Sequence, residues 1–199
     1  MSTMIDIRRL RTVNKLARAG ASTVAEHLEQ LTGVETEMQI TRINVIEVDD
    51  LGTALGETKQ VGVNIPLVER PYGSVLVLFE DASARRLANT MLGGMASDGG
   101  TTTGGYSEME RSAIREVGNI MTSGFIDGWA NVLGRTIDIS TPQLVRASGH
   151  DIVDHCIDPG EHEIAMVFDS TLKAPDADVE ATIYSFPDIE EFVAMINDI

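Results

Sequence analysis

Two long helical segments, each followed directly by a glycine, stand about 100 residues apart in this chain of 199 residues. Apolar and small residues recur at intervals of three and four before Gly33 and again before Gly134, which is the spacing of a buried stripe on an α-helix. A glycine at such a point favours a left-handed helix end. Each long helix is followed by β-branched segments and a shorter helix, so the sequence predicts a duplicated fold.

The expected elements can be placed in order along the chain. In the first half they are a helix from residue 2 or 3 to Gly33, a strand at 35–48, a loop at 49–58, strands at 61–67 and 75–79, and a helix capped by Asp81 that ends at Gly93. In the second half they are a helix from Ser107 to Gly134, a strand from 136 to 145, strands at 152–157, 163–168 and 179–186, and a helix capped by Asp188. The glycine-rich connector at 94–106 lacks the Gly-Lys-Ser/Thr of a phosphate-binding loop.

The second long helix has a polar row opposite its apolar stripe. Ser107 and Glu110 form a capping-box pattern at its start. At about 100° per residue, four polar residues fall within roughly 60° of one another: Ser112, Glu116, Asn119 and Ser123. Glu116 and Asn119 therefore project a carboxylate and a carboxamide side by side. Such a pair is also common on any solvated helix face, so the pair alone does not define a site.

A longer pattern contains this pair. Ser112, Glu116 and Asn119 are followed, after 22 residues, by Pro142, and residues 116 to 120 read Glu-Val-Gly-Asn-Ile. The pattern resembles the active-site signature of the CheC family of chemotaxis phosphatases, which CheX and the flagellar switch phosphatase FliY share. All four positions match at the family spacing, and the length and order of elements resemble a whole CheC chain.

The resemblance implies an α+β fold. Duplicated halves would be related by a pseudo-twofold axis, in a mainly antiparallel sheet that carries the two long helices on one face. Residues 1–199 would form a single domain, with a first half at 1–93, the connector at 94–106 and a second half at 107–199.

The resemblance also implies an enzyme that hydrolyses the phospho-aspartate of CheY, a response regulator. Positioning of water does most of the work in phosphoryl transfer. Glu116 and Asn119 would be catalytic, inserting into the CheY site and orienting the water, because a carboxamide donates and accepts hydrogen bonds while a carboxylate accepts them. Ser112 and Pro142 would support them. The Mg²⁺ would lie on CheY itself, so no cofactor or metal is expected in this chain.

The first helix does not repeat the signature. Aligning Asn14 with Asn119 puts Arg11 at the position of Glu116, and aligning the two glycines puts Lys15 there. A cation replaces the carboxylate in both cases, so this first site, marked by Arg11 and Asn14, is expected to be inactive. A basic row takes its place: Arg8, Arg11, Lys15 and Arg18. This row is either a solvated helix face or a docking surface for an acidic partner, such as a response regulator or another chemotaxis protein.

The net charge of −16, with 31 acidic residues against 15 basic ones, predicts a strongly negative surface. Such a surface repels nucleic acid and anionic membranes, and its shortage of lysine is typical of halophilic proteins, so we expect a salt-adapted archaeon as the source. The one cysteine excludes an internal disulfide and fits a reducing cytosol. Without a long apolar run or a signal-peptide pattern, the chain is expected to be cytoplasmic.

A group of potential metal ligands lies in the second half. Its members are His150, Asp151, Asp154, His155, Cys156 and His162. Their spacing matches no zinc motif, and they are expected to flank a hairpin turn at 158–160. Cys156 is therefore expected in the core, and His162 and the acidic residues on an edge strand, rather than in a metal site.

Two other functions stay open. One is a non-enzymatic adaptor that binds CheY or CheD, the receptor-modifying protein with which CheC proteins commonly associate, in chemotaxis or archaellum signalling. The other is a flagellar switch component of the FliM or FliY kind, which would need additional modules for which this chain has no room. The intact pair of Glu116 and Asn119 favours catalysis.

Overall fold

The computed structural model describes residues 10–33, 35–93, 105–157, 164–174 and 179–198. The first half contains α1 (Leu10–Thr32), β1 (Glu37–Glu47), α2 (Val48–Leu55), β2 (Gln60–Leu67), β3 (Gly73–Glu80) and α3 (Asp81–Met91). The second half contains α4 (Glu108–Leu133), β4 (Gln143–Ala147), α5 (Gly149–Cys156), β5 (Ile164–Ala174), β6 (Val179–Pro187) and α6 (Ile189–Asn197). The same order of elements therefore occurs twice.

The six strands of the described residues form one antiparallel sheet in the order β1-β5-β6-β3-β2-β4. Exchanging β1 with β4, β2 with β5 and β3 with β6 gives the same order read backwards, as a pseudo-twofold axis between β6 and β3 requires. The first strand of each half pairs with a strand of the other half, since β1 lies beside β5 and β4 beside β2. The two halves are thus interleaved.

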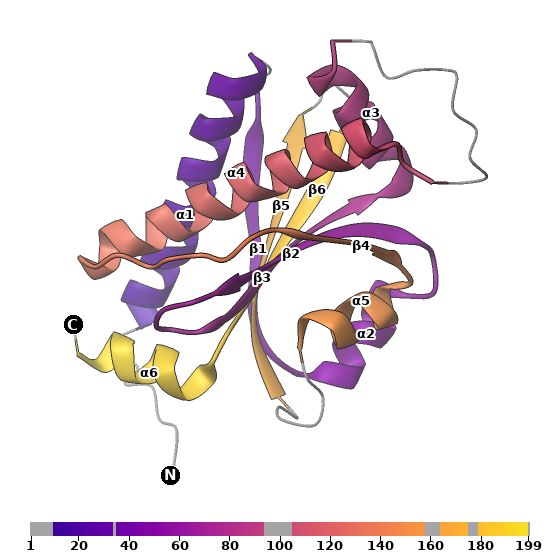
Figure 1. Ribbon diagram of the computed structural model, residues 1–199. Coiled ribbons are helices and arrows are strands. Elements are labelled where there is room, and N and C mark those ends of the chain that lie inside the picture. The colour runs from indigo at the N-terminus through magenta and orange to yellow at the C-terminus, as the bar shows by residue number, and fades with distance from the viewer. Residues whose placement is uncertain (1–9, 34, 94–104, 158–163, 175–178, 199) are drawn as a thin grey trace.

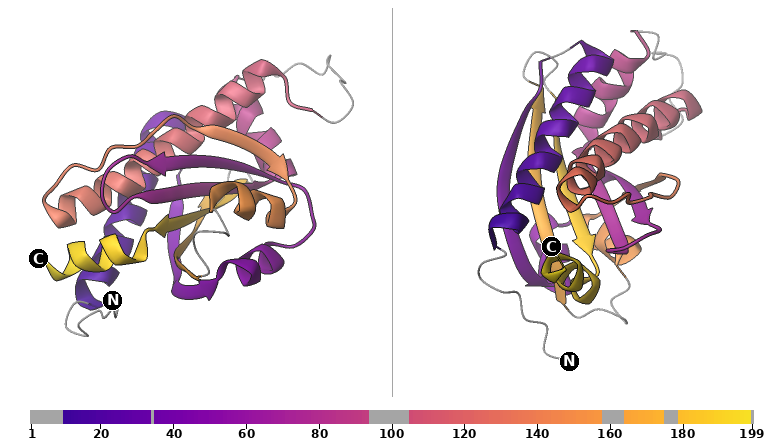
Figure 2. Two further views of the ribbon diagram at one scale, coloured as in Figure 1. Left: turned by 60° about the horizontal axis from the view of Figure 1, so that its bottom comes forward. Right: turned by 90° about the vertical axis from the view of Figure 1, so that its left-hand side faces the viewer.

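Helices cover both faces of this sheet. The long helices α1 and α4 cross on one face, and the short helices α2 and α5 pack together on the other (Figures 1 and 2). Alternate residues of β3 contribute to the two cores: Val75, Val77 and Phe79 face α4, whereas Leu76 and Leu78 belong to the cluster around α2 and α5. The α+β class with two long helices on one face is therefore confirmed. No helix in the described ranges combines the length and apolar character that a membrane span needs.

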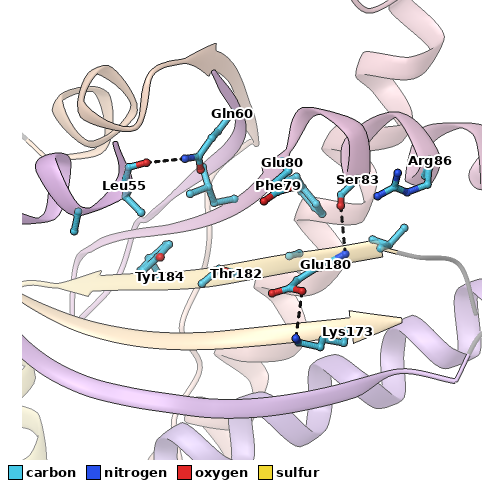
Figure 3. Close-up of a pocket in the computed structure, with 14 residues that line it drawn as sticks. Leu55, Gln60, Phe79, Glu80, Ser83, Arg86, Lys173, Glu180, Thr182 and Tyr184 are labelled. Carbon is cyan, nitrogen blue, oxygen red and sulfur yellow. Dashed lines mark hydrogen bonds and ion pairs between the residues drawn. The ribbon is translucent and has the colours of Figure 1, made fainter. Parts of the chain in front are cut away.

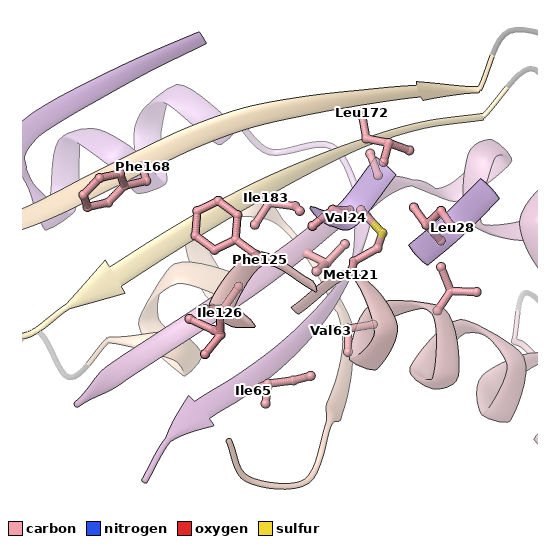
Figure 4. Close-up of a cluster of buried hydrophobic side chains, with 14 of the residues drawn as sticks. Val24, Leu28, Val63, Ile65, Met121, Phe125, Ile126, Phe168, Leu172 and Ile183 are labelled. Carbon is pink, nitrogen blue, oxygen red and sulfur yellow. The ribbon is translucent and has the colours of Figure 1, made fainter. Parts of the chain in front are cut away.

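The larger core lies between the sheet and the two long helices (Figure 4). Trp129 of α4 is fully buried there, with its ring centroid 4.8 Å from that of Phe168 and 5.5 Å from that of Phe192. The contact with Phe168 is edge-on and that with Phe192 is tilted, and aromatic pairs of this kind stabilise beyond the area that they bury. The cluster fixes the C-terminal half of α4 against β5 and α6.

Glycines let α1 and α4 approach closely at their crossing. A Cβ atom added at Gly128 would lie 2.5 Å from the backbone carbon of Ala19 and from Cα of Gly20. A Cβ atom at Gly124 would lie 3.0 Å from Cα of Val24. Backbone cannot move aside as a flexible side chain can, so these positions require glycine although glycine weakens a helix interior.

The loop expected at 49–58 and the strand expected at 152–157 are both wrong, because these segments form α2 and α5. The β-branched residues Ile152 and Val153 gave a strand pattern, but they are buried on one side of a helix. Gly52 gave a loop pattern, but a Cβ atom there would lie 2.5 Å from the ring nitrogen Nδ1 of His150. The close contact of two short helices, rather than a flexible loop, explains this glycine. The hairpin turn expected at 158–160 lies outside the described residues.

The strand expected from 136 to 145 is only partly correct. The chain follows β2 from Asp138 onward, with hydrogen bonds from Val68 N to Asp138 O (3.0 Å) and from Ser140 N to Pro66 O (2.8 Å), but the regular strand begins at Gln143. Proline has no N–H to donate, and both Pro66 and Pro142 lie in this stretch. The missing donors explain the interrupted pairing.

Smaller differences concern the helix ends. The start expected for the first helix and most of the connector, residues 1–9 and 94–104, lie outside the described residues. Asp81 is not the cap of α3, since Glu80 holds that position without a side-chain hydrogen bond and Asp81 begins the first turn. Asp188 does cap α6, with Oδ1 accepting a hydrogen bond from Glu191 N at 2.9 Å.

Substituting Gly128 with alanine should lower the free energy of unfolding by about 1–3 kcal/mol, because the new methyl group would push α4 away from the backbone of α1. Urea-induced unfolding measures this change. Asn131→Ala, at an exposed position of the same helix, is the control and should change stability by less than about 0.5 kcal/mol. A Gly128→Ala protein that is more stable than wild type would show that propensity, not the crossing, governs this position.

Candidate active site

The helix that carries the polar row has well-defined ends. Ser107 N donates to Glu110 Oε2 at 2.7 Å, and Glu110 N donates to Ser107 Oγ at 3.3 Å, so the predicted capping box is confirmed. Gly134 ends α4 in the left-handed conformation, with φ of 64°. Because both ends are fixed, the row between them has a defined direction.

A polar cluster that the sequence reasoning missed holds the start of α4 against α3 and β4. The carboxylate oxygen Oδ1 of Asp81 accepts hydrogen bonds from Arg146 Nε at 2.7 Å and from the Tyr106 hydroxyl at 3.0 Å, and Oδ2 accepts one from Arg85 Nε at 3.2 Å. The Arg85 guanidinium also lies 4.5 Å from the centre of the Tyr106 ring, a distance typical of cation–π contact. Tyr106 directly precedes the Ser107 cap, so this cluster fixes where the helix begins.

The cluster shifts two pKa values. Burial raises the pKa of the Asp81 carboxyl, but its hydrogen bonds from Arg146, Tyr106 and Arg85 lower it and outweigh burial, so the net shift is downward. Burial and the hydrogen bond to Asp81 raise the pKa of the Tyr106 hydroxyl. Asp81 is therefore ionised and Tyr106 neutral at neutral pH.

The row itself faces outward from α4. Ser112 and Glu116 are exposed, and Asn119 and Ser123 are half-buried. Across the described part of the chain, the side chains of Glu116 and Asn119 form no hydrogen bond or ion pair with other residues. The carboxylate and the carboxamide are thus available to a partner while the helix beneath them is packed.

Pro142 directly precedes β4, which packs against α4. A Cβ atom at Gly118 would lie 2.5 Å from Cγ1 of Val63, and Val63 pairs with Leu144 on the neighbouring strand. Leu144 packs against the core beneath α4, and Pro142 precedes it by two residues, or about 7 Å along an extended chain. Gly118 directly precedes Asn119, so Pro142 lies two residues before a strand residue that packs beneath this part of α4.

Pro142 also occupies an irregularity in the strand edge. Two residues of β2 lie between Asn64 and Leu67, whereas three residues lie between their partners Gln143 and Ile139. The extra residue on the outer chain has the count of a β-bulge. A proline without an N–H suits such a position, and its ring limits how the chain bends there.

The exposed methionine at the start of α4 is another residue that the sequence reasoning missed. Met109 is 61% exposed, and at about 100° per residue it lies within roughly 20° of Glu116 around the helix. A flexible thioether side chain is well suited to contact a protein surface. Its exposure, which becomes evident only in the structure, adds an apolar side chain to the outward face.

The α1 positions equivalent to this row follow from where the corresponding elements of the two halves begin and end. α1 ends at Thr32 and α4 at Leu133, and 133 − 32 is 101; α2 and α5 begin at Val48 and Gly149, and 149 − 48 is again 101. Gly33 and Gly134 both have positive φ, at 66° and 64°. The glycine-based alignment therefore describes the repeat. Three α1 residues correspond to Ser112, Glu116 and Asn119, respectively: Arg11, Lys15 and Arg18.

Asn14, by contrast, corresponds to Arg115 in this alignment. Asn14, Arg11, Lys15 and Arg18 are all exposed. No carboxylate stands beside an amide on this face of α1, so it lacks the pair that α4 presents. Arg8 lies outside the described residues.

A separate hollow of about 520 Å³ lies between α2 and α3 over β6 (Figure 3). Its polar groups bind one another: Lys173 Nζ lies 3.3 Å from Glu180 Oε2, and Gln60 Nε2 donates to Leu55 O at 2.8 Å. None of the residues of the polar row lines it. We therefore assign the candidate site to the outward face of α4 and not to this hollow.

The potential metal ligands of the second half lie on α5 and not on a hairpin. His155 Nε2 is 3.3 Å from Gln143 Oε1, and His150 Nε2 is 3.7 Å from Asp154 Oδ2. Asp151 contacts the Ser148 cap. Cys156 packs against the smaller core as predicted, and burial raises the pKa of its thiol to about 12. His162 lies outside the described residues.

Comparison with known proteins relates this chain to one protein family. A sequence model of the CheC-like family matches residues 109–146, which include Ser112, Glu116, Asn119 and Pro142. The chain is also 78% identical, over 100% of both lengths, to a protein of Halobacterium salinarum whose name proposes that it is a CheY-P phosphatase, CheC1. The chain belongs to the CheC-like family.

Solved structures place this CheC-like chain in a wider group with one fold. FliY of Thermotoga maritima has a TM-score of 0.75 at 16% identity and covers 98% of this chain and 96% of its own. The FliM middle domain of H. pylori has a TM-score of 0.68 at 10% identity and covers 98% and 100%. CheX of Desulfovibrio desulfuricans has a TM-score of 0.52 at 17% identity and covers 85% and 97%. Identities this low show a common fold alone.

Substituting Asp81 with asparagine should lower the free energy of unfolding by about 1 kcal/mol near neutral pH, after allowance for partial exposure of the cluster. Because the pKa of Asp81 is lowered in the folded protein, its contribution is present above the unfolded pKa of about 4. It is lost as the pH falls through the folded value. Urea unfolding across this acidic range should show the variant and wild type converging at low pH.

Asp127→Asn, an exposed change on the same helix as the row, is the control for that series. It removes the same negative charge but leaves intact the hydrogen bonds of Asp81 with Arg146, Tyr106 and Arg85. A difference between the Asp81 variant and wild type that stays constant as the pH falls would contradict an ionic role for Asp81.

Proposed function

We propose that this CheC-like protein hydrolyses the phospho-aspartate of a CheY response regulator, with Glu116 and Asn119 as its catalytic residues. The observation that carries the proposal is an intact signature on an outward helix face, in a chain 78% identical to a relative assigned as a CheY-P phosphatase. The regulator would dock on α4 so that this pair enters its phosphorylation site. CheY is a soluble signalling protein, so we place the reaction in the cytoplasm.

The reaction needs a water held in line with the bond that breaks. The water oxygen forms a bond to phosphorus while the bond from phosphorus to the aspartyl oxygen breaks. The products are an aspartate carboxylate and dihydrogen phosphate, which keeps both protons of the water. Because charge in this transition state spreads over the phosphoryl oxygens, catalysis depends on positioning and on nearby cations.

Asn119 is the residue best suited to hold that water. Its carboxamide oxygen can accept a proton of the water in a hydrogen bond, and its N–H₂ can donate to a phosphoryl oxygen. Glu116, one turn away, can only accept when ionised, so its role would be to bind the water or a cationic side chain of the regulator. The Mg²⁺ that neutralises phosphoryl charge would be held by the regulator's own carboxylates.

Ser112, Pro142 and Met109 would shape the contact around this pair. Ser112 is a small exposed residue one turn before Glu116, so a partner can approach the helix closely there. Pro142 would stiffen the chain beside the row. Met109 would give an apolar contact at the outer end of the same face.

Glu116→Ala and Asn119→Ala should each lower the rate of CheY dephosphorylation by about tenfold or more, because each removes a group that positions water. The rate is measured as decay of phospho-CheY at saturating concentrations of this protein, and the affinity is measured separately by titration. Affinity should change little, since the regulator contacts a wider face than these two side chains.

Asn131→Ala is the matched control, because Asn131 is an exposed asparagine on the same helix. Its rate should equal that of wild type. Weaker binding with an unchanged rate in the bound complex would make the α4 face a docking site rather than a catalytic one. No acceleration by the wild-type protein, with folded CheY and CheD present, would favour an adaptor that binds these proteins.

A further inference from the structure

The outward face of α1 is cationic in an otherwise strongly acidic protein. Arg11, Lys15 and Arg18 are exposed, and they line a shallow hollow of about 470 Å³ together with Asn14 and Ala19. The net charge of the whole chain is −16. A local group of cations on such a protein creates a field of opposite sign to the rest of its surface.

Within the described ranges, no acidic side chain neutralises these three cations. Among the described residues, Arg11, Lys15 and Arg18 form no ion pair, and α1 places no acidic residue three or four positions from any of them. Elsewhere cations do pair: Arg70 Nε lies 3.0 Å from Glu191 Oε2 and Lys173 Nζ lies 3.3 Å from Glu180 Oε2. Like charges one turn apart repel each other, so the row lowers the stability of the isolated protein.

The cationic face occupies the place on α1 that the candidate catalytic row occupies on α4. In the 101-residue repeat, Lys15 corresponds to Glu116 and Arg18 to Asn119. The two helices are related by the pseudo-twofold arrangement of the sheet. A protein surface that fits over one helix therefore meets a similar backbone shape over the other, with cations in place of a carboxylate and an amide.

We propose that the α1 face is a second docking site for the same response regulator, which it holds in the unphosphorylated, metal-free state without acting on it. This inference rests on the proposed function, since it takes its partner from there. A pocket that binds Mg²⁺ is lined by carboxylates, and without the metal these carboxylates repel one another. The Lys15 ammonium or the Arg18 guanidinium supplies the missing positive charge.

The charge of each face suits a different state of the regulator. An anionic Glu116 is favoured by positive charge on the partner, so the α4 face suits the phosphorylated pocket while that pocket holds its metal. Lys15 and Arg18 repel that metal, so the α1 face fits the pocket after phosphate and Mg²⁺ have left. The α1 face would thus retain the product of the reaction on α4.

The test uses the purified cognate regulator, fluorescently labelled, with its binding followed by anisotropy in EDTA and in Mg²⁺. Lys15→Gln/Arg18→Gln should weaken binding of the metal-free regulator by roughly tenfold or more. Mg²⁺ should weaken the binding of the unphosphorylated regulator to the wild-type α1 face by a similar factor. Phospho-regulator decay should stay within about twofold of wild type, because the α4 pair is unchanged.

Lys59→Gln/Arg135→Gln is the matched control, since it removes the same charge from two other exposed positions. It should leave the affinity for the metal-free regulator within about twofold of wild type. An equal loss in this control, or no loss in Lys15→Gln/Arg18→Gln, would overturn the proposal. Full competition by a polyglutamate peptide would also overturn it, because the face would then be selective for charge only.

The two proposals can fail separately. A wild-type protein that binds the metal-free regulator through Lys15 and Arg18 but does not accelerate phosphate loss would refute the phosphatase and leave the α1 site intact. Acceleration that depends on Glu116 and Asn119, with no metal-free binding, would refute the α1 site alone.

Discussion

The close crossing of α1 and α4 is the constraint on which the other features of this protein depend. Gly124 and Gly128 bring the backbones of the two helices into direct contact, and Gly118 seats α4 directly on Val63 of the sheet. Once these contacts fix the rotation of α4 about its own axis, the opposite side of the helix has only one possible orientation. Backbone packing therefore holds the carboxylate and the carboxamide of the row, although neither side chain forms a hydrogen bond or ion pair within the described structure.

This arrangement suits chemistry that relies on position. The transferred phosphoryl group is anionic, and a surface of −16 net charge repels it at long range. At an ionic strength of about 1 M, that repulsion would be screened over roughly 3 Å, and recognition would then depend on contacts at close range. A rigid helix with an amide, a carboxylate and an exposed methionine provides such contacts without requiring a general electrostatic attraction.

The sequence predicted most of the fold, because the periodicity of the long helices and the residues that cap them are local signals. The repeat of these signals about 100 residues later predicted the duplication. Ser107 with Glu110, Asp188, and the glycines after α1 and α4 all lie where the sequence placed them. The short helices were missed because tertiary contact outweighs propensity there: Gly52 packs against His150, and Ile152 packs into a core.

The sequence proposes the residues of the candidate site, whereas only the structure gives their surroundings. The spacing from Ser112 to Pro142 is enough to identify the four residues of the signature. The sequence left two alignments for the first helix, and only the matching ends of α1 with α4 and of α2 with α5 distinguish them. The contact of Tyr106 with Asp81 and Arg146 joins residues up to 65 positions apart, and no local pattern reports such a contact.

The exchange of β1 and β4 between the halves has a consequence for how this protein can diverge. Each half contributes its first strand to the edge of the other half's strand pair, so a half on its own would leave that edge without its partner. Strand pairing therefore holds the two halves together as one unit. The outward face of each long helix takes no part in that pairing. A duplicated chain built in this way can change the chemistry of one face completely and keep the scaffold that the other face needs.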